Sequence, residues 1–80
     1  FAAWCGPCRA LAPVLDALAE ARPELRIGKV DVDAQPELAA RFDVLTVPTL
    51  LLFRSGRLLR RTTGAKTLTE LEEFLRSGEA

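Results

Sequence analysis

Trp4-Cys5-Gly6-Pro7-Cys8 contains both cysteines of this 80-residue chain, with two residues between them. Two thiols at this spacing can close into a disulfide and reopen while the domain stays folded. A helix is expected to begin at Pro7, and the N-terminal end of a helix stabilises a thiolate, the reactive form of cysteine. Cys5 can be exposed just before this helix, and Cys8, one turn in, is more enclosed. The motif therefore predicts redox chemistry, with Cys5 as nucleophile and Cys8 as resolving thiol.

Composition sets the limits of this interpretation. The chain has 11 basic and 11 acidic residues, so its formal charge of zero does not indicate nucleic acid or an anionic membrane as a partner. Apolar runs fall well short of the roughly 18 residues of a membrane span. Two cysteines without any histidine provide neither a disulfide scaffold nor a closed zinc site. A metal would need ligands shared between two chains, so no metal is expected.

Apolar spacing predicts three helices. The first covers 7–21, with a kink at Pro13 because proline removes a backbone hydrogen bond. The second is short, covers 37–42 and is opened by Pro36. The third follows a capping box, Thr67-Leu68-Thr69-Glu70, runs to about residue 77 and ends at Gly78. The side chains expected to be buried recur at helical spacing: Leu11, Val14, Leu15 and Leu18 in the first helix, and Leu68, Leu71, Phe74 and Leu75 in the third.

Three strands are expected at 25–32, 49–54 and 57–63. The last two are joined by Ser55-Gly56 and should form a hairpin. The order of elements is helix, strand, helix, strand, strand, helix, which is typical of a single small α/β domain.

The chain resembles the thioredoxin family along its whole length, through several motifs in the family's order. They are Phe1-Ala2-Ala3-Trp4-Cys5-Gly6-Pro7-Cys8, Ala12-Pro13, Lys29-Val30-Asp31-Val32-Asp33, Val47-Pro48-Thr49 and Gly64-Ala65. The resemblance implies a thioredoxin-like fold, in which a mixed sheet is flanked by helices. Residues 1–80 would then be the C-terminal portion of a thioredoxin domain that lacks its first strand, its first helix and most of its central strand.

The same resemblance assigns site residues. Pro48 matches the family's cis-proline, which faces the cysteines and turns the Val47 backbone toward an extended substrate segment. An apolar substrate surface would surround Cys5, formed by Trp4, Gly6, Pro7, Val47, Pro48, Thr49, Gly64 and Ala65. Without the family pattern, Pro48 would be interpreted as the start of an edge strand, Gly64 as a turn glycine, and Trp4 equally well as a core residue.

Lys29 is a charged residue in the middle of a strand expected to be interior, where an unpaired charge is costly. The resemblance places it near a buried carboxylate that takes the proton of the resolving cysteine. This carboxylate would belong to a strand before Phe1. Asp31 and Asp33 do not match it and are interpreted as strand-end or capping residues.

A missing central strand would leave 25–32 and 49–54 with exposed apolar edges. We therefore expect the 80 residues alone to be marginally stable or unfolded, and roughly 25–30 further residues to precede them, the length that a strand–helix–strand unit needs. A cooperative melt of the isolated chain with native-like near-UV dichroism would contradict this expectation.

The predicted function is reduction of protein disulfides by thiol–disulfide exchange, with the cysteine pair in place of any cofactor. Expected partners are disulfide-containing proteins and thioredoxin reductase, and the complete protein is expected to be a cytoplasmic monomer. Two alternatives remain: an oxidase or isomerase of the same fold, and a non-catalytic binding or chaperone module.

Overall fold

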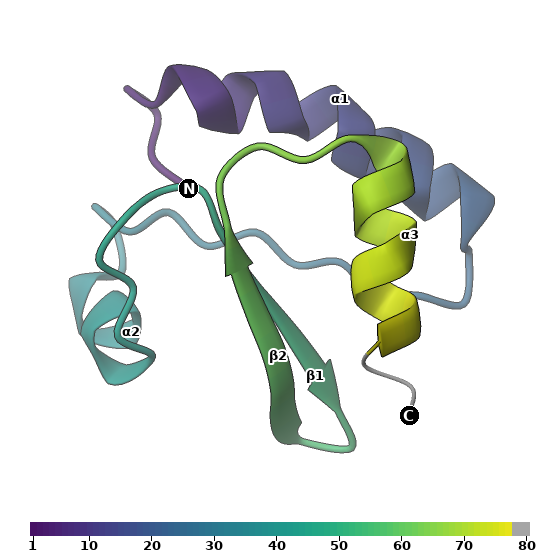
Figure 1. Ribbon diagram of the computed structural model, residues 1–80. Helices are drawn as coiled ribbons and strands as arrows, with labels where there is room; N and C mark the ends of the chain where they lie inside the picture. The colour runs from purple at the N-terminus through teal and green to yellow at the C-terminus, as the bar shows by residue number, and fades with distance from the viewer. Residues whose placement is uncertain (78–80) are drawn as a thin grey trace.

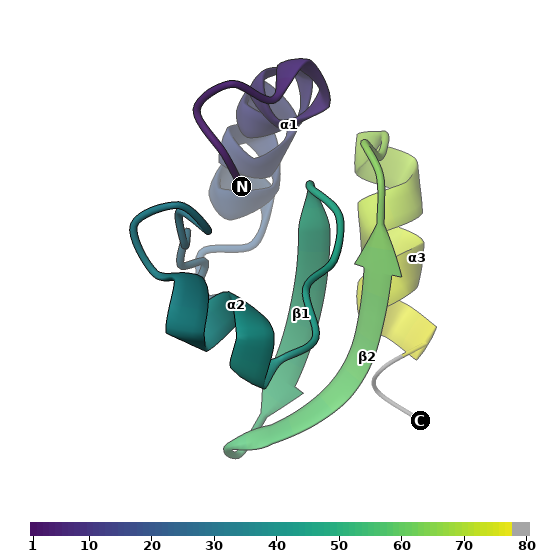
Figure 2. The same ribbon diagram turned by 90° about the vertical axis from the view of Figure 1, so that its left-hand side faces the viewer.

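The computed structural model describes residues 1–77, so the predicted terminator Gly78 lies outside the described residues. Three helices and two strands follow in the order α1 (Gly6–Ala21), α2 (Pro36–Arg41), β1 (Thr49–Arg54), β2 (Arg57–Thr63) and α3 (Leu68–Ser77). Figure 1 shows α1 running across one end of the molecule, with the hairpin extending away from it. The two shorter helices, α2 and α3, lie on opposite sides of the hairpin in both ribbon views (Figures 1 and 2).

α1 begins one residue before its predicted start, because Cys5 is the N-cap and its side chain accepts the Cys8 backbone N–H. Pro7 occupies the first turn, where the lack of an N–H has no cost, and Pro13 lies inside the helix, as expected. At the other end, the Arg22 N–H donates to the Leu18 carbonyl at 2.9 Å. The helix therefore carries the two-cysteine motif at its N-terminal end.

The hairpin has the predicted bounds. β1 and β2 pair antiparallel, from Thr49 opposite Thr63 to Arg54 opposite Arg57, with a register shift between Leu52 and Phe53. The two turn residues, Ser55 and Gly56, both have positive φ, 52° and 78°. Two such residues match the right-handed twist of the strands, which is why a turn of this kind closes a tight hairpin.

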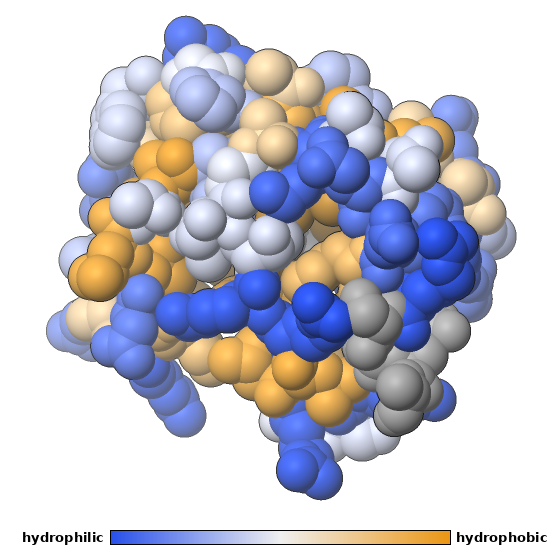
Figure 3. Space-filling view, in the orientation of Figure 1, coloured by the Kyte–Doolittle hydropathy of each residue, from blue (hydrophilic) through white to orange (hydrophobic). Residues whose placement is uncertain are grey.

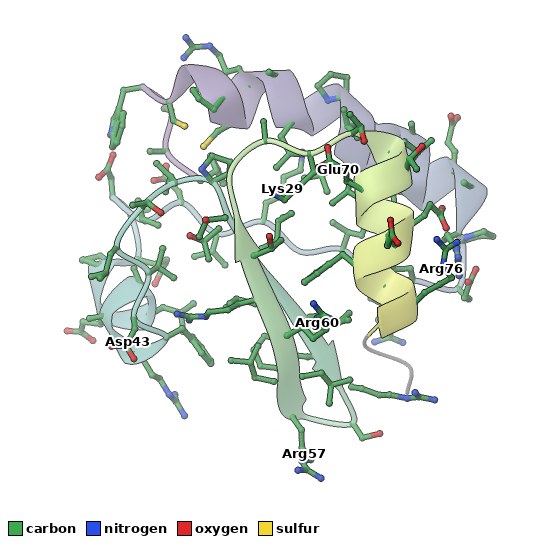
Figure 4. All side chains as sticks on the ribbon, viewed as in Figure 1. Lys29, Asp43, Arg57, Arg60, Glu70 and Arg76 are labelled. Carbon is green, nitrogen blue, oxygen red and sulfur yellow. The ribbon has the colours of Figure 1, made fainter. Side chains whose placement is uncertain are left out.

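α3 begins with the predicted capping box. The Glu70 backbone N–H donates to the Thr67 hydroxyl at 3.1 Å, and the Thr67 N–H donates to the Glu70 carboxylate at 3.0 Å, at the end of α3 where Glu70 is labelled in Figure 4. The bond from the Thr67 backbone, followed by that from its side chain, lowers the pKa of Glu70. The cap therefore fixes where the helix starts.

The main core lies where α1 crosses α3. Its buried residues are Leu11 and Leu18 of α1 and Leu71 and Leu75 of α3, and strand residues such as Leu50 and Leu52 pack against them. The Arg22 guanidinium also bonds the Glu72 carboxylate, with Nη2 to Oε2 at 2.6 Å. Apolar burial and one ion pair thus join the C-terminal half of α1 to α3.

The predicted strand at 25–32 is wrong as stated, because this segment is not a strand among the described residues. Two backbone hydrogen bonds join this segment to Phe1, which is distant in sequence. The Phe1 nitrogen donates to the Val30 carbonyl at 2.8 Å, and the Val32 N–H donates to the Phe1 carbonyl at 2.9 Å. One facing residue does not make a ladder. Among the described residues the sheet is the two-stranded β1–β2 hairpin, and with its flanking helices it has the predicted α/β arrangement.

An apolar trough of about 760 Å³ lies between this segment and β1. Its walls come from α1, the segment 25–32, β1 and α3, and include Leu15, Ile27, Val30, Leu50 and Phe74. Apolar side chains also reach the outer surface around the hairpin, between rows of hydrophilic residues (Figure 3), among them Phe53 and Leu58. Cys8 and Pro48 line the trough as well, so it extends to the cysteine end of α1.

Candidate functional site

The two cysteines meet at the N-terminal end of α1. Both are free thiols in this structure, and the Cys8 backbone N–H donates to the Cys5 Sγ at 3.2 Å. The Cys5 N–H itself donates to the Ala2 carbonyl at 3.1 Å, which closes a turn just before the helix. Sulfur at the N-cap faces the positive end of the helix dipole, where negative charge is favoured.

The expected difference in exposure between the two cysteines is not observed. Cys5 has 4% of its surface exposed and Cys8 has 8%, so the predicted nucleophile is no more accessible than the predicted resolving thiol. The physical reason is that the Cys5 sulfur turns back onto the first helical turn, and Val47 and Val32 pack against the cluster that it forms with Ala2 and Cys8.

The surroundings of Cys8 affect its protonation. Burial raises the pKa of the Cys8 thiol above its ordinary value of 9.0, and the hydrogen bond with Cys5 raises it further. The Ala2 backbone has a smaller, opposite effect. The Cys8 thiol is therefore held in its protonated form at neutral pH.

The Val47–Pro48 segment reaches the cysteine cluster through Val47. The Val47–Pro48 peptide bond is cis, Pro48 is buried, and Val47 packs against the cysteine cluster. The Pro48 carbonyl accepts the Gly64 N–H at 3.0 Å. This hydrogen bond joins Gly64 to the cis-proline segment. Gly64 has φ of 87°, in the region that favours glycine.

The other predicted surface residues have varied exposure. Trp4 has 68% of its surface exposed, and Gly6, Pro7 and Ala65 are also exposed. Thr49 is half-buried, and its hydroxyl donates to the Thr46 carbonyl at 2.6 Å. Its hydroxyl is therefore engaged in holding the loop before Pro48.

Lys29 does not meet the expectation of a charge buried in an interior strand. It is exposed, and Figure 4 shows it between α1 and the hairpin, where it lines the trough. It forms no ion pair with any residue of 1–77. The segment around it is extended without strand neighbours, so solvent reaches its side chain.

The side chains of Asp33 and Arg9 hold the site together, and neither was assigned this role from the sequence. The Trp4 indole Nε1–H donates to the Asp33 carboxylate at 2.8 Å, and an Arg9 Nη1–H donates to the Ala3 carbonyl at 2.9 Å. Asp31 closes a turn, since its carboxylate accepts the Asp33 N–H at 2.9 Å, whereas the N-cap of α2 is Gln35. From the sequence, Asp33 was interpreted as a strand-end or capping residue like Asp31. Nothing in the neighbouring sequence indicates that its partner is the Trp4 indole.

Across residues 1–77, no three His, Cys, Asp or Glu side chains gather where they could hold a metal ion. None of the helices described there combines the length and the apolar character that crossing a membrane requires.

Comparisons with known proteins agree on one family. The family model described as Thioredoxin matches residues 1–77. A thioredoxin of Chlamydia muridarum is 45% identical over 75 residues, which cover 94% of this chain and 74% of that protein. A bifunctional thioredoxin reductase/thioredoxin of Mycobacterium leprae is 48% identical over 67 residues, 82% of this chain but only 15% of that protein. The crystal structure of Fasciola hepatica thioredoxin is similar with a TM-score of 0.90 and 42% identity, and the match covers 98% of this chain and 74% of that one.

Proposed function

Because the chain belongs to the thioredoxin family of thiol–disulfide oxidoreductases, we propose that it reduces protein disulfides through Cys5 and Cys8. The observation that carries this proposal is the pair of free thiols at the start of α1, joined by the 3.2 Å contact of the Cys8 N–H with the Cys5 Sγ. The chain covers 15% of the length of the bifunctional relative, so the activity of the whole protein is itself proposed here.

In the first step, the Cys5 thiolate attacks one sulfur of a substrate disulfide. A bond forms between Cys5 and that sulfur, the substrate S–S bond breaks, and the second substrate sulfur leaves as a thiolate that takes up a proton. The helix N-terminus supports negative charge on Cys5 before the attack, and the Cys8 N–H already points at its sulfur.

In the second step, Cys8 attacks the Cys5 sulfur of the mixed disulfide. The Cys5–Cys8 bond forms, the mixed disulfide breaks, and the proton of Cys8 passes to the departing substrate thiolate. Two electrons have then moved from the dithiol to the substrate. Because a protonated thiol attacks poorly, the raised pKa of Cys8 disfavours Cys8 as the first nucleophile.

Substrate recognition is proposed to rest on the surface around Cys5. The cis Val47–Pro48 bond supports a role of the Val47 backbone in pairing with an extended substrate segment. The exposed part of this surface comes from Trp4, Gly6, Pro7 and Ala65. Thr49 and Gly64 stabilise the loop that contains Pro48 through hydrogen bonds to the Thr46 and Pro48 carbonyls. Such a surface accepts varied proteins because it requires backbone and apolar contact. Lys29 is exposed at the trough, and we propose for it only a supporting role toward the thiols.

The partners follow from the chemistry. Disulfide-containing proteins are the substrates, and a thioredoxin reductase returns the Cys5–Cys8 disulfide to the dithiol; one relative carries both names in a single chain. The cysteine pair carries the electrons, so the reaction calls for no metal or organic cofactor. We propose a monomer in the reducing cytoplasm, where dithiols persist.

A trapping experiment tests the proposed function. Cys8→Ser should leave the attacking thiol without a resolving partner, so mixed disulfides with substrate proteins should accumulate and be released by dithiothreitol. Cys5→Ser is the matched control and should trap none. If Cys8→Ser traps nothing and the unsubstituted protein does not reduce insulin, the chain is a binding module and the proposal is wrong.

The direction of electron flow separates a reductase from an oxidase or isomerase of the same fold. Equilibration of the Cys5–Cys8 pair with glutathione should give a potential near the reducing end of the range for such proteins, about −270 mV. A potential near about −120 mV would assign the protein to the oxidising group instead.

A further inference from the structure

Lys66 places a positive charge beside the proposed substrate surface. It follows directly after Gly64 and Ala65, which belong to that surface, and the sequence assigned it no role. The Lys66 Nζ donates to the Thr63 carbonyl at 2.7 Å, and a Cβ added at Gly64 would lie 3.8 Å from the same nitrogen. Lys66 is half-buried, so its side chain lies against the protein. The ammonium is therefore held next to Gly64.

One peptide group connects this ammonium to the cis-proline segment. The Thr63 carbonyl that accepts the ammonium N–H belongs to the same peptide group as the Gly64 N–H, which donates to the Pro48 carbonyl at 3.0 Å. Standard bond lengths then place the ammonium within about 8 Å of the Pro48 carbonyl. Val47, on the other side of the cis bond, packs against the cysteine cluster. The charge thus lies near the backbone with which an extended substrate segment is proposed to pair.

The stability of α3 does not explain a cation at this position. Lys66 directly precedes Thr67, at the end of a helix where positive charge is disfavoured. Thr67 and Glu70 already cap this end by their reciprocal hydrogen bonds. The bond from the Thr67 backbone is the main cause of the lowered pKa of Glu70, and the charge of Lys66 is the smallest cause.

The ammonium can bind a further group. It has three N–H donors, and the Thr63 carbonyl accepts one of them. Within residues 1–77 Lys66 forms no ion pair, so two donors can point to a substrate. A carboxylate is the substrate group that this charge favours.

We infer that Lys66 is a specificity residue that favours protein disulfides flanked by acidic residues. The inference rests on the proposed function. A substrate carboxylate beside the reacting cysteine binds the Lys66 ammonium while the substrate backbone lies along Val47. For an exposed ion pair of this kind, the expected preference over a neutral substrate is about two- to fivefold in kcat/KM. A small neutral disulfide does not sense the charge.

The test uses three disulfide-linked peptide dimers that differ only in the residues on both sides of the cysteine: glutamate, glutamine or lysine. Rates are divided by those with dithiothreitol, which corrects for the effect of flanking charge on the disulfide itself. The unsubstituted chain should prefer the glutamate peptide over the glutamine peptide about two- to fivefold in kcat/KM. Lys66→Gln should abolish this preference, Lys66→Arg should keep it, and Lys66→Glu should shift it to the lysine peptide.

Arg57→Gln is the matched control, because it removes one positive charge at the hairpin turn, which lies at the far end of the hairpin from α1 (Figure 4). It should keep the preference for glutamate. The neutral bis(2-hydroxyethyl) disulfide should be reduced equally by all variants, and about 0.5 M sodium chloride should weaken the preference of the unsubstituted chain. A preference that persists in Lys66→Gln, or that Arg57→Gln loses to the same extent, would overturn the inference.

A binding measurement separates this inference from the proposed function. If the unsubstituted chain reduces none of the disulfides, the proposed function is wrong, and peptides with serine in place of cysteine then decide the role of Lys66. Followed by the amide NMR shifts of residues 64–66, the glutamate peptide should bind more tightly than the lysine peptide. Lys66→Gln should bind both peptides equally. Equal binding of the two peptides by the unsubstituted chain would contradict the role of Lys66.

Discussion

The two ends of α1 are held in place by different forces. At the N-terminal end, short hydrogen bonds between near neighbours fix Cys5, Cys8 and the segment before them. At the C-terminal end, Leu18 packs against buried leucines of α3, and Arg22 binds Glu72 across 50 residues of sequence. The hydrogen bonds at the two thiols are thus local in sequence, whereas the α1–α3 contact joins residues far apart in sequence.

This difference explains how a disulfide can form and break on a small domain. The atoms that change partners belong to one helical turn and its N-cap, so closing the Cys5–Cys8 bond asks for little movement elsewhere. The α1–α3 contact shares no buried residue with the cysteine cluster, since Leu11, Leu18, Leu71 and Leu75 form one cluster and Ala2, Cys5 and Cys8 form the other. Substitutions at one end should therefore leave the properties of the other end unchanged.

The largest effect is expected for Cys5→Ser. Disulfide reduction should fall by about a thousandfold or more, since the reaction loses its nucleophile. Serine is a good N-cap, so the hydroxyl can accept the Cys8 N–H and the free energy of unfolding should change by less than about 1 kcal/mol. Insulin reduction and urea denaturation measure the two quantities. A large loss of stability would show that the cysteine end also supports the core.

The opposite pattern is expected for Leu71→Ala. Leu71 has only 2% of its surface exposed, so truncation should lower the free energy of unfolding by about 2–5 kcal/mol, with activity per folded molecule unchanged. Leu68→Ala is the matched control on the same helix, because Leu68 is 38% exposed and should cost less than about 1 kcal/mol. Equal losses for the two variants would contradict the assignment of the core to the α1–α3 contact.

A smaller effect is expected at the Arg22–Glu72 ion pair. The two side chains are 30% and 24% exposed, so solvent screens their attraction, and a double-mutant cycle with alanine should give a coupling free energy of about 1 kcal/mol. Arg22 also approaches Glu24, at 3.8 Å, but Glu24 is 69% exposed. The Arg22–Glu24 cycle is the control and should give a coupling near zero. If the two cycles gave the same coupling, the ion pair would contribute nothing specific to the α1–α3 contact.

The sequence was informative wherever the determinant is local. The Ser55-Gly56 turn and the Thr67–Glu70 capping box depend on neighbouring residues and were predicted correctly, and the start of the first helix was predicted to within one residue. The strand at 25–32 was wrong because a strand also needs partners, and apolar spacing does not supply them. The cis form of the Val47–Pro48 bond was expected only from the resemblance to a family.

Side-chain partners distant in sequence were the main omission. The Trp4–Asp33 bond spans 29 residues, and both of its members were assigned other roles or left as alternatives. The prediction that Cys5 is exposed was wrong for a related reason. Cys5 lies at a helix start, where a side chain is often accessible, but Val47 from a distant loop packs against the cluster of Ala2, Cys5 and Cys8. Contacts of this kind depend on how elements meet, which a pattern along the chain does not encode.

The smallest expected effect concerns pH and the cysteine end alone. The pKa of Cys8 is higher in the folded protein than in the unfolded chain, so the folded state holds this proton more tightly. The resulting stability is fully present below the ordinary value of 9.0 and is lost as pH rises through that value toward the folded pKa. In the reduced protein, Cys8→Ser should therefore lose less stability than the unsubstituted chain between neutral and alkaline pH, as measured by urea midpoints at each pH. Burial is the main cause of the raised Cys8 pKa, and Leu71 does not belong to the cysteine cluster, so Leu71→Ala should keep the pH dependence of the unsubstituted chain. If Leu71→Ala flattened the pH dependence as Cys8→Ser does, the two ends of α1 would be coupled.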